Sequence, residues 1–261
     1  MNRIDKMFQN LNSKKEKGLF PFVTAGYPDL NTTEKIIYTL EKAGADLIEI
    51  GVPFSDPIAD GPIIQKSSHM ALQNGINIDK IFDMIKKIRQ NTNIPIVLMS
   101  YYNPLLKLGK EYIVEKSLES GVDGFIIPDL LINESEDFNN FLSKHNLYQI
   151  FLASINTKLE RLQRITKKTK GFLYLISKLG VTGPADLNVD IIKEKVDYIR
   201  SISNIPIAIG FGISNKNQVN QIKNLGDAVI VGSALIKIIG SNKNNIDDAS
   251  NFIHELKNAL K

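Results

Sequence analysis

The chain has 261 residues and a formal net charge of +4, with 43% hydrophobic and 23% charged residues. Such values are near the averages of globular proteins and argue against intrinsic disorder. Cysteine is absent, which excludes disulfide frameworks, thiolate zinc sites and thiol nucleophiles. The lysines are spread along the whole chain rather than gathered into one patch, so we expect no nucleic-acid partner. No apolar stretch is long enough to span a membrane and the N-terminal segment lacks the pattern of a secretory signal, so we expect a cytoplasmic protein.

Short apolar runs alternate along the chain with longer stretches of helical period. Residues 31–44 and 78–90 have the spacing of amphipathic helices, and Asn31 is the expected N-cap of the first. Eight apolar runs predict strands, at residues 19–24, 46–51, 95–101, 124–129, 148–153, 171–177, 206–212 and 227–233.

The predicted strands are continuously apolar rather than alternating, which is typical of strands covered by helices on both sides of a parallel sheet. Eight strand–helix units fill the chain. We therefore predict one domain over residues 1–261, a TIM (β/α)8 barrel with a parallel eight-stranded core. A doubly wound open sheet is the alternative. In a TIM barrel the chemistry lies where the strands end and the following loops begin.

The second predicted strand ends in a carboxylate, Glu49. Side chains alternate along a strand, so Glu49 shares a face with Leu47, while Ile48 and Ile50 share the other face. If Glu49 faces the barrel lumen, burial raises its pKa toward the range useful for proton transfer. A structural carboxylate held by a neighbouring hydroxyl or amide is the alternative.

The loop that follows this strand favours a functional site. It spans residues 51–62 and holds three prolines, which fix its shape, together with Asp56 and Asp60. A shaped loop that presents carboxylates at a barrel mouth is more typical of a site than of a simple connection.

Other strand ends predict a phosphate site and a lid. Residues 210–214 and 232–233 are glycine-rich ends of the last two predicted strands, the usual place of a phosphate site in this fold. Residues 177–189 form a long polar loop of the kind that closes over a substrate. The three histidines lie in predicted helices without the spacing of metal ligands, so we expect no metal.

Three segments together closely resemble the tryptophan synthase alpha subunit family. They are FVTAGYPD from residue 22, DLIEIGVPFSDPIADGP from residue 46 and YLISKLGVTG from residue 174. The second, which contains Glu49, is the most distinctive of the three. IGFGIS and IVGSALIK add agreement at the phosphate end, and the resemblance covers the whole chain.

The resemblance implies a lyase of tryptophan biosynthesis that cleaves indole-3-glycerol phosphate to indole and glyceraldehyde 3-phosphate. It implies Glu49 and Asp60 as the catalytic pair, with no metal and no cofactor in this chain. It also implies a substrate-binding set consisting of Phe22, Tyr101, Tyr174, Thr182, Gly183, Gly212, Gly232 and Ser233. Lys178 stands where many members have a lid arginine.

The resemblance further implies a heterotetramer of two alpha and two beta subunits, in which the beta subunit carries pyridoxal phosphate. Residues 102–109 place four apolar side chains in what we expect to be a strand-to-helix loop, and this segment is the candidate docking surface. Alternatively, its leucines cap the barrel or begin the next helix.

Two rival functions remain at this stage. One is another phosphate-binding barrel enzyme, such as a phosphoribosylanthranilate isomerase or a pentose-phosphate epimerase, although the epimerase needs metal ligands that the predicted strand ends lack. The other is a non-catalytic activator of a beta subunit, against which the intact Glu49 and Asp60 argue.

Overall fold

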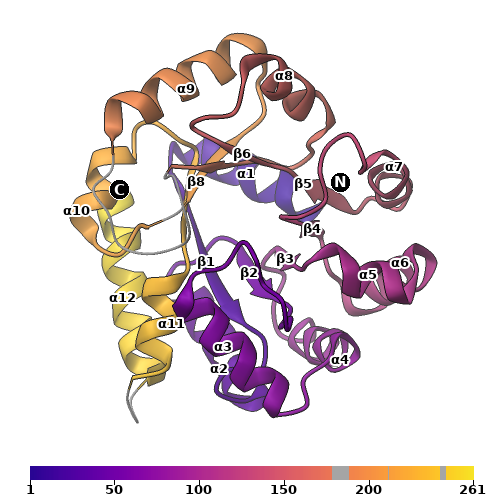
Figure 1. Cartoon of the computed structure of the whole chain (residues 1–261). Coiled ribbons are helices and arrows are strands. Elements are labelled where there is room, and N and C mark those ends of the chain that lie inside the picture. The colour runs from indigo at the N-terminus through magenta and orange to yellow at the C-terminus, as the bar shows by residue number, and fades with distance from the viewer. Residues whose placement is uncertain (178–187, 211, 242–244) are drawn as a thin grey trace.

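A computed structural model describes residues 1–177, 188–210, 212–241 and 245–261 of the chain (Figure 1). Within this part, nine strands form one sheet in the order β5-β4-β3-β2-β1-β9-β8-β7-β6, and every pair of neighbours is parallel. The strands are β1 (Gly18–Thr24), β2 (Ile48–Gly51), β3 (Ile96–Met99), β4 (Gly124–Ile126), β5 (Tyr148–Ile150), β6 (Leu152–Ser154), β7 (Leu173–Ile176), β8 (Ile207–Gly210) and β9 (Ala228–Val231).

The sheet curls into a barrel, as predicted, because the strands at the two ends of this order are consecutive in the chain. Only Phe151 separates β5 from β6. Its backbone N–H donates to the hydroxyl of Thr169, 3.1 Å away, instead of to a neighbouring strand. This side-chain hydrogen bond interrupts the ladder and divides the fifth predicted strand into two. All eight predicted strand positions are confirmed.

Helices surround the strands (Figure 1). The described residues form α1 (Arg3–Lys14), α2 (Leu30–Lys42), α3 (Pro62–Gln73), α4 (Ile78–Ile88), α5 (Tyr102–Leu108), α6 (Lys110–Ser120), α7 (Glu136–Lys144), α8 (Leu159–Lys168), α9 (Val189–Ile202), α10 (Lys216–Ile222), α11 (Ser233–Ile239) and α12 (Asn245–Leu260). Among these helices, none is long and apolar enough to cross a membrane.

The predicted N-cap of α2 was wrong. The cap is Asp29, whose side chain accepts a hydrogen bond of 2.9 Å from the backbone N–H of Thr32. Asn31 lies inside the first turn of the helix. Both residues are good N-caps by type, and Asp29 takes the role because it is extended at the end of the preceding turn.

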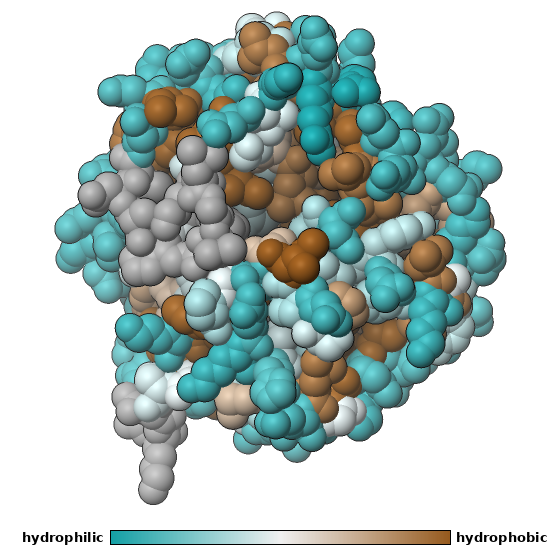
Figure 2. Space-filling view, viewed as in Figure 1, coloured by the Kyte–Doolittle hydropathy of each residue, from teal (hydrophilic) through white to brown (hydrophobic). Residues whose placement is uncertain are grey.

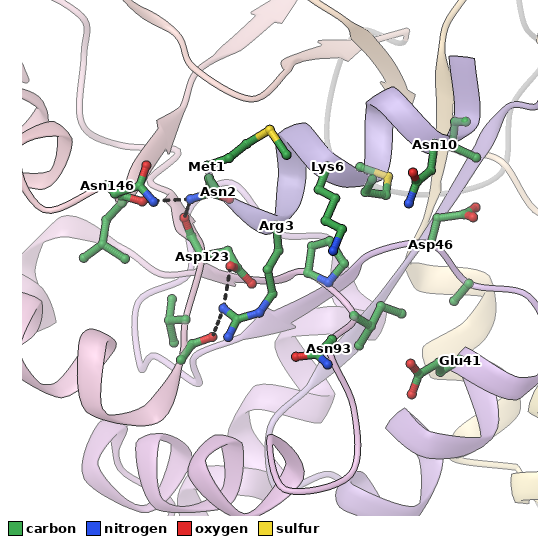
Figure 3. Close-up of a pocket in the computed structure, with 18 of the residues that line it drawn as sticks. Met1, Asn2, Arg3, Lys6, Asn10, Glu41, Asp46, Asn93, Asp123 and Asn146 are labelled. Carbon is green, nitrogen blue, oxygen red and sulfur yellow. Dashed lines mark hydrogen bonds and ion pairs between the residues drawn. The ribbon is translucent and has the colours of Figure 1, made fainter. Parts of the chain in front are cut away.

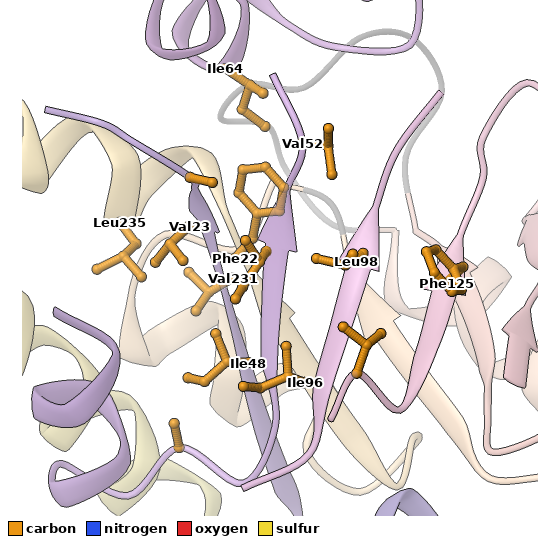
Figure 4. Close-up of a cluster of buried hydrophobic side chains, with 14 of the residues drawn as sticks. Phe22, Val23, Ile48, Val52, Ile64, Ile96, Leu98, Phe125, Val231 and Leu235 are labelled. Atoms are coloured by element: carbon orange, nitrogen blue, oxygen red, sulfur yellow. The ribbon is translucent and has the colours of Figure 1, made fainter. Parts of the chain in front are cut away.

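Apolar side chains form two layers, one between strands and helices and one in the barrel lumen. Figure 4 shows part of the outer layer, including Ile48, Ile96 and Leu98 from neighbouring strands. Ile50 belongs to the same layer, whereas Leu47 packs in the lumen. The predicted alternation along β2 is therefore confirmed, and it turns the side chain of Glu49 toward the lumen.

One end of the lumen is filled by aromatic rings. Phe8 of α1 packs against Phe20 and Phe172, with ring centroids 5.9 and 6.1 Å apart, and Phe20 and Phe172 lie 5.3 Å from each other. All three rings are buried. Helix α1 thus closes the barrel at the amino-terminal ends of the strands and leaves the opposite end for a site.

Three aspartates join neighbouring strands at this closed end. Asp46, Asp123 and Asp227 each precede a strand and accept a hydrogen bond from the backbone N–H at the start of the neighbouring strand. The three N···O distances are 2.8, 2.8 and 2.9 Å. Each carboxylate is also paired with a cation, which is Lys257 for Asp46, Arg3 and Arg89 for Asp123, and Lys17 and Arg200 for Asp227.

A cavity of about 820 Å³ lies beside α1 at this closed end (Figure 3). Its buried polar groups bond to one another. The amide of Asn2 donates to the backbone carbonyls of Asp123 and Asn146, and Arg3 pairs with the Asp123 carboxylate at 2.9 Å. We interpret these contacts as the attachment of α1 to the barrel rather than as a ligand site.

Candidate active site

Glu49 lies on β2 with only 2% of its surface exposed. Its neighbours in the sheet register are Phe22 on β1 and Val97 on β3. No described residue donates a hydrogen bond to its carboxylate. Burial, followed by the nearby negative charge of Asp60, raises the pKa of Glu49 to about 8. A carboxylic acid with such a pKa keeps its proton at neutral pH and can donate it.

Asp60 lies in the loop between β2 and α3 and is 6% exposed. The hydroxyl of Tyr101 donates a hydrogen bond of 3.1 Å to its Oδ2 atom. The same hydroxyl accepts from the backbone N–H of Ala59 at 2.9 Å. Gln65 donates to the backbone carbonyl of Asp60 at 2.8 Å. Two hydrogen bonds to Asp60, and one that ties its neighbour Ala59 to Tyr101, therefore fix the position of Asp60.

The two carboxyl groups are held in different protonation states. Burial raises the pKa of Asp60 to about 6, against the opposing effect of the Tyr101 hydrogen bond. At pH 7 Asp60 is therefore mostly ionised while Glu49 is mostly protonated. One proton donor and one carboxylate close enough to interact are the arrangement that acid–base chemistry requires.

Aromatic rings form the wall around this pair. Phe22 on β1 lies beside Glu49 in the sheet register and is 4% exposed, and Tyr174 on β7 is 7% exposed. Burial, and then the Glu49 and Asp60 carboxylates, raise the pKa of Tyr174 well above its usual range, so its hydroxyl stays protonated. The space for these rings depends on glycine. A Cβ atom on Gly51 would lie 2.5 Å from the Phe22 ring, and one on Gly210 would lie 2.7 Å from the Tyr174 hydroxyl.

A second cavity, of about 450 Å³, lies at the ends of β8 and β9. Gly212 and Ser233, two of the predicted phosphate-binding residues, are part of its lining. Gly212 has φ +81°, a conformation that favours glycine. Gly232 immediately precedes α11 and has no such requirement, because an added Cβ atom would make only ordinary contacts.

The sequence reasoning missed several residues of these two regions. Ser214 and Lys237 line the same cavity as Ser233. The isolated lysine in the apolar segment IVGSALIK was a usable signal for Lys237. Phe54 and Gln65, which contact Tyr101 and Asp60, had no such signal. Thr182, Gly183 and Lys178 lie outside the described residues, as does most of the predicted lid.

The prediction that residues 102–109 form a loop was wrong, and the alternative that these leucines begin the next helix is confirmed. Tyr102–Leu108 is helix α5, which begins directly after β3. Leu105 is 1% exposed and belongs to the core, whereas Leu106 is 60% exposed. Leu105 and Leu106 differ in exposure because adjacent residues of a helix point in directions about 100° apart around its axis.

Known proteins resemble this chain over its whole length. Residues 8–261 match the family described as "Tryptophan synthase alpha chain". The chain is 42% identical to the tryptophan synthase alpha chain of Petrotoga mobilis, over all of this chain and 98% of the relative. Among solved structures, it resembles tryptophan synthase subunit alpha of Legionella pneumophila, with a TM-score of 0.91 and 33% identity over 100% and 98% of the two chains.

A chain in a solved structure of Mycobacterium tuberculosis tryptophan synthase is also similar, with a TM-score of 0.92 and 29% identity over 99% of this chain and 98% of that one. The matches extend over the whole barrel, including β2 and the loop that follows it, which carry Glu49 and Asp60. The chain therefore belongs to the tryptophan synthase alpha chain family, the lyases of tryptophan biosynthesis that cleave indole-3-glycerol phosphate to indole and glyceraldehyde 3-phosphate.

Proposed function

We propose that Glu49 and Asp60 carry out this cleavage as an acid and a carboxylate. The observation that supports the proposal is their pairing: both are buried, they interact, and their pKa values are raised to about 8 and about 6. The family's reaction needs such a pair, because indole leaves as a stable molecule only after its C3 carbon has been protonated.

In the proposed mechanism, protonated Glu49 transfers its proton to C3 of the indole ring. The resulting indoleninium cation carries its charge mainly at the ring nitrogen. Asp60 accepts a hydrogen bond from this N–H group and stabilises the positive charge as it develops, an effect that is usually large in a water-poor site.

The Glu49 carboxylate then takes the proton of the glycerol hydroxyl next to the ring. The C–C bond breaks, its electron pair moves into the ring and neutralises the cation, and the hydroxyl carbon becomes the aldehyde of glyceraldehyde 3-phosphate. Glu49 ends the reaction protonated, as it began, so a single residue serves as acid and then as base.

We place the rest of the substrate along the lumen toward β8 and β9. Phe22 and Tyr174 would flank the indole ring and the glycerol chain, with Tyr101 fixing Asp60. Gly212, Gly232 and Ser233 would bind the phosphate through backbone N–H groups, and Thr182 and Gly183 would contribute from the predicted lid. No metal or cofactor of this chain takes part in the proposed steps.

The test is indole release from indole-3-glycerol phosphate by the isolated chain. Glu49→Gln keeps the shape of the side chain but removes the transferable proton. We expect a loss of about 10²-fold or more in kcat, the usual size for a general acid that acts twice. Glu16→Gln, at the closed end of the barrel, is the matched control. A Glu49→Gln variant that keeps more than about a tenth of the kcat refutes the assignment, and a wild-type chain without activity favours the non-catalytic rival.

We also propose that the chain docks a tryptophan synthase beta subunit at the barrel mouth, in an assembly of two alpha and two beta chains. Ile58, Leu106 and Leu131 are 78%, 60% and 46% exposed, and they follow the neighbouring strands β2, β3 and β4. Figure 2 shows hydrophobic side chains near the centre of the viewed face, among hydrophilic ones. Exposed apolar residues on one sector are typical of an interface.

In this assembly the beta subunit supplies pyridoxal phosphate and consumes the indole. We propose a cytoplasmic location for the reaction, because a charged phosphate ester does not leave the compartment in which it is made. We further propose that residues 1–261 act as one domain, since β1 pairs with both β2 and β9 and so joins the two halves of the chain.

A further inference from the structure

Phe54 contacts the proposed catalytic machinery from outside it. The residue lies in the loop between β2 and α3 and is partly exposed. Its ring stacks on that of Tyr101, with centroids 5.2 Å apart and planes inclined by 29°. Offset stacking of this kind contributes about 0.5–1.5 kcal/mol beyond simple burial and restricts the orientation of both rings. The substrate-binding set inferred from the family resemblance does not include Phe54.

The ring on which Phe54 stacks holds Asp60. The Tyr101 hydroxyl donates to Oδ2 of Asp60 and accepts from the N–H of Ala59, so both of its hydrogen bonds go to adjacent residues of one loop. Hydrogen bonds weaken steeply when the angle at the donor departs from linearity. A tilt of the Tyr101 side chain at its Cα–Cβ bond displaces the hydroxyl oxygen and therefore affects both contacts together.

We propose that Phe54 is a positioning residue for Asp60, which acts by holding the Tyr101 ring in the orientation that lets its hydroxyl bridge Ala59 and Asp60. The proposal rests on the proposed role of Asp60 in catalysis. The loop between β2 and α3 carries Phe54, which stacks on the Tyr101 ring. The same loop carries Ala59 and Asp60, the two residues to which the Tyr101 hydroxyl is hydrogen-bonded. The loop thus contributes to fixing its own conformation.

The pKa of Asp60 can be measured and tests this proposal directly. Its titratable neighbours among the described residues are Glu49 on β2, Tyr101 after β3 and Tyr174 on β7, and Asp129 acts in turn on Tyr101. Of these groups, Tyr101 is the hydrogen-bond donor that stabilises ionised Asp60. If the Tyr101 ring rotates away, the carboxylate loses this donor and the pKa of Asp60 rises further above its ordinary value.

The test is a carbon-13 NMR titration of the aspartate carboxyl groups in the full chain, with the Asp60 signal assigned by Asp60→Asn. We expect Phe54→Leu, and Phe54→Met as a second variant, to move the Asp60 titration to higher pH. Phe54→Tyr retains a ring and should leave the titration near wild type. Phe141→Leu, a partly buried phenylalanine in ring contact with His145, is the matched control and should change nothing.

A double-variant cycle shows whether Phe54 acts through Tyr101. Tyr101→Phe should shift the titration and lower kcat by about tenfold, the size expected for one hydrogen bond to a charged group. Adding Phe54→Leu to Tyr101→Phe should then have no further effect. Independent, additive shifts overturn the proposal, and so does an unchanged Asp60 titration in Phe54→Leu. The titration does not depend on Asp60 being catalytic, so full activity in Asp60→Asn would refute the proposed function without deciding this one.

Discussion

The two buried carboxyl groups differ mainly in whether a hydrogen bond offsets the cost of burying their charge. Glu49 has no hydrogen-bond donor among the described residues, whereas Asp60 receives one from Tyr101. Burial alone disfavours the charged form of both carboxyls, and the donor partly reverses this effect for Asp60. The order of the two pKa values therefore reflects the deeper burial of Glu49 and the nearby Asp60 charge, to which the Tyr101 hydroxyl adds by stabilising ionised Asp60.

The pH dependence of kcat/KM tests this order. Asp60 must be ionised, so activity is lost as pH falls through about 6, and Glu49 must be protonated, so activity is lost as pH rises through about 8. We expect a bell-shaped profile between these limits, measured as indole release. A profile that rises continuously with pH would contradict the role of Glu49 as an acid.

Asp60→Asn should change both sides of this profile. An amide accepts a hydrogen bond but cannot neutralise a cation, so we expect kcat to fall by about 10²-fold. The acidic limb should disappear. The alkaline limb should move to lower pH, because the Asp60 charge contributes to the raised pKa of Glu49. A variant in which only KM changes would make Asp60 a binding residue rather than a transition-state stabiliser.

The phosphate proposal is tested at Ser233. Ser233→Asp places a negative charge where the phosphate is expected, beside the cavity at β8 and β9. We expect calorimetry to detect no binding of glycerol phosphate, while circular dichroism remains that of the wild type. Binding of undiminished strength would move the phosphate site to another part of the barrel.

At the scale of the elements, the strands were predictable and their exact ends were not. Strands buried on both faces are apolar along nearly their whole length, and such apolar runs can be recognised in the sequence alone. The N-cap of α2 at Asp29 and the start of α5 at Tyr102 depend on local backbone conformation, for which several residues compete. The contact between Phe54 and Tyr101 joins residues far apart in the chain and depends on the loop conformation, so a single sequence contains little information about it.

The aspartates that join neighbouring strands provide a stability test. Asp123 is 3% exposed, and it binds Arg89, Arg3 and the N–H of Ile96. Asp123→Ala leaves the nearly buried Arg89 guanidinium without its carboxylate. We therefore expect the free energy of unfolding, measured by urea titration, to fall by about 3–5 kcal/mol.

Asp227→Ala is the control, because Asp227 makes the same bond to a neighbouring strand but is 28% exposed. The loss should be clearly smaller there, since water can solvate the released cation. Equal losses at the two positions would show that the strand contact, and not the buried charge pair, determines the effect.

At the scale of the whole molecule, the mouth of the barrel is the surface that we propose for a partner. The segments that present Ile58, Leu106 and Leu131 are tied together by two hydrogen bonds, in which the N–H of Ala59 donates to the Tyr101 hydroxyl and the N–H of Tyr102 donates to the Asp129 carboxylate. A partner that presses on this sector therefore acts on the loop that carries Asp60. By linkage, a ligand on this chain should then strengthen the association by the same factor as the partner strengthens ligand binding.

Leu106→Asp tests the docking surface. A carboxylate in an apolar interface loses its hydration, so we expect weaker association with a tryptophan synthase beta subunit in ultracentrifugation and an unchanged basal cleavage rate. Leu118→Asp is the control, because Leu118 is 54% exposed but lines the cavity at the closed end. Leu105 is unsuitable for this test, since it is buried in the core. Equal association of both variants would place the interface elsewhere.

The aromatic closure of the lumen by Phe8, Phe20 and Phe172 makes the described barrel a dead end. Substrate and products must then pass through the same open end of the barrel. The proposed beta subunit, docked over this open end to collect indole, would also have to leave a way in for the phosphorylated substrate and a way out for the aldehyde. Substrate binding and product release must therefore occur one after the other, and a new substrate molecule can enter only after the previous products have left.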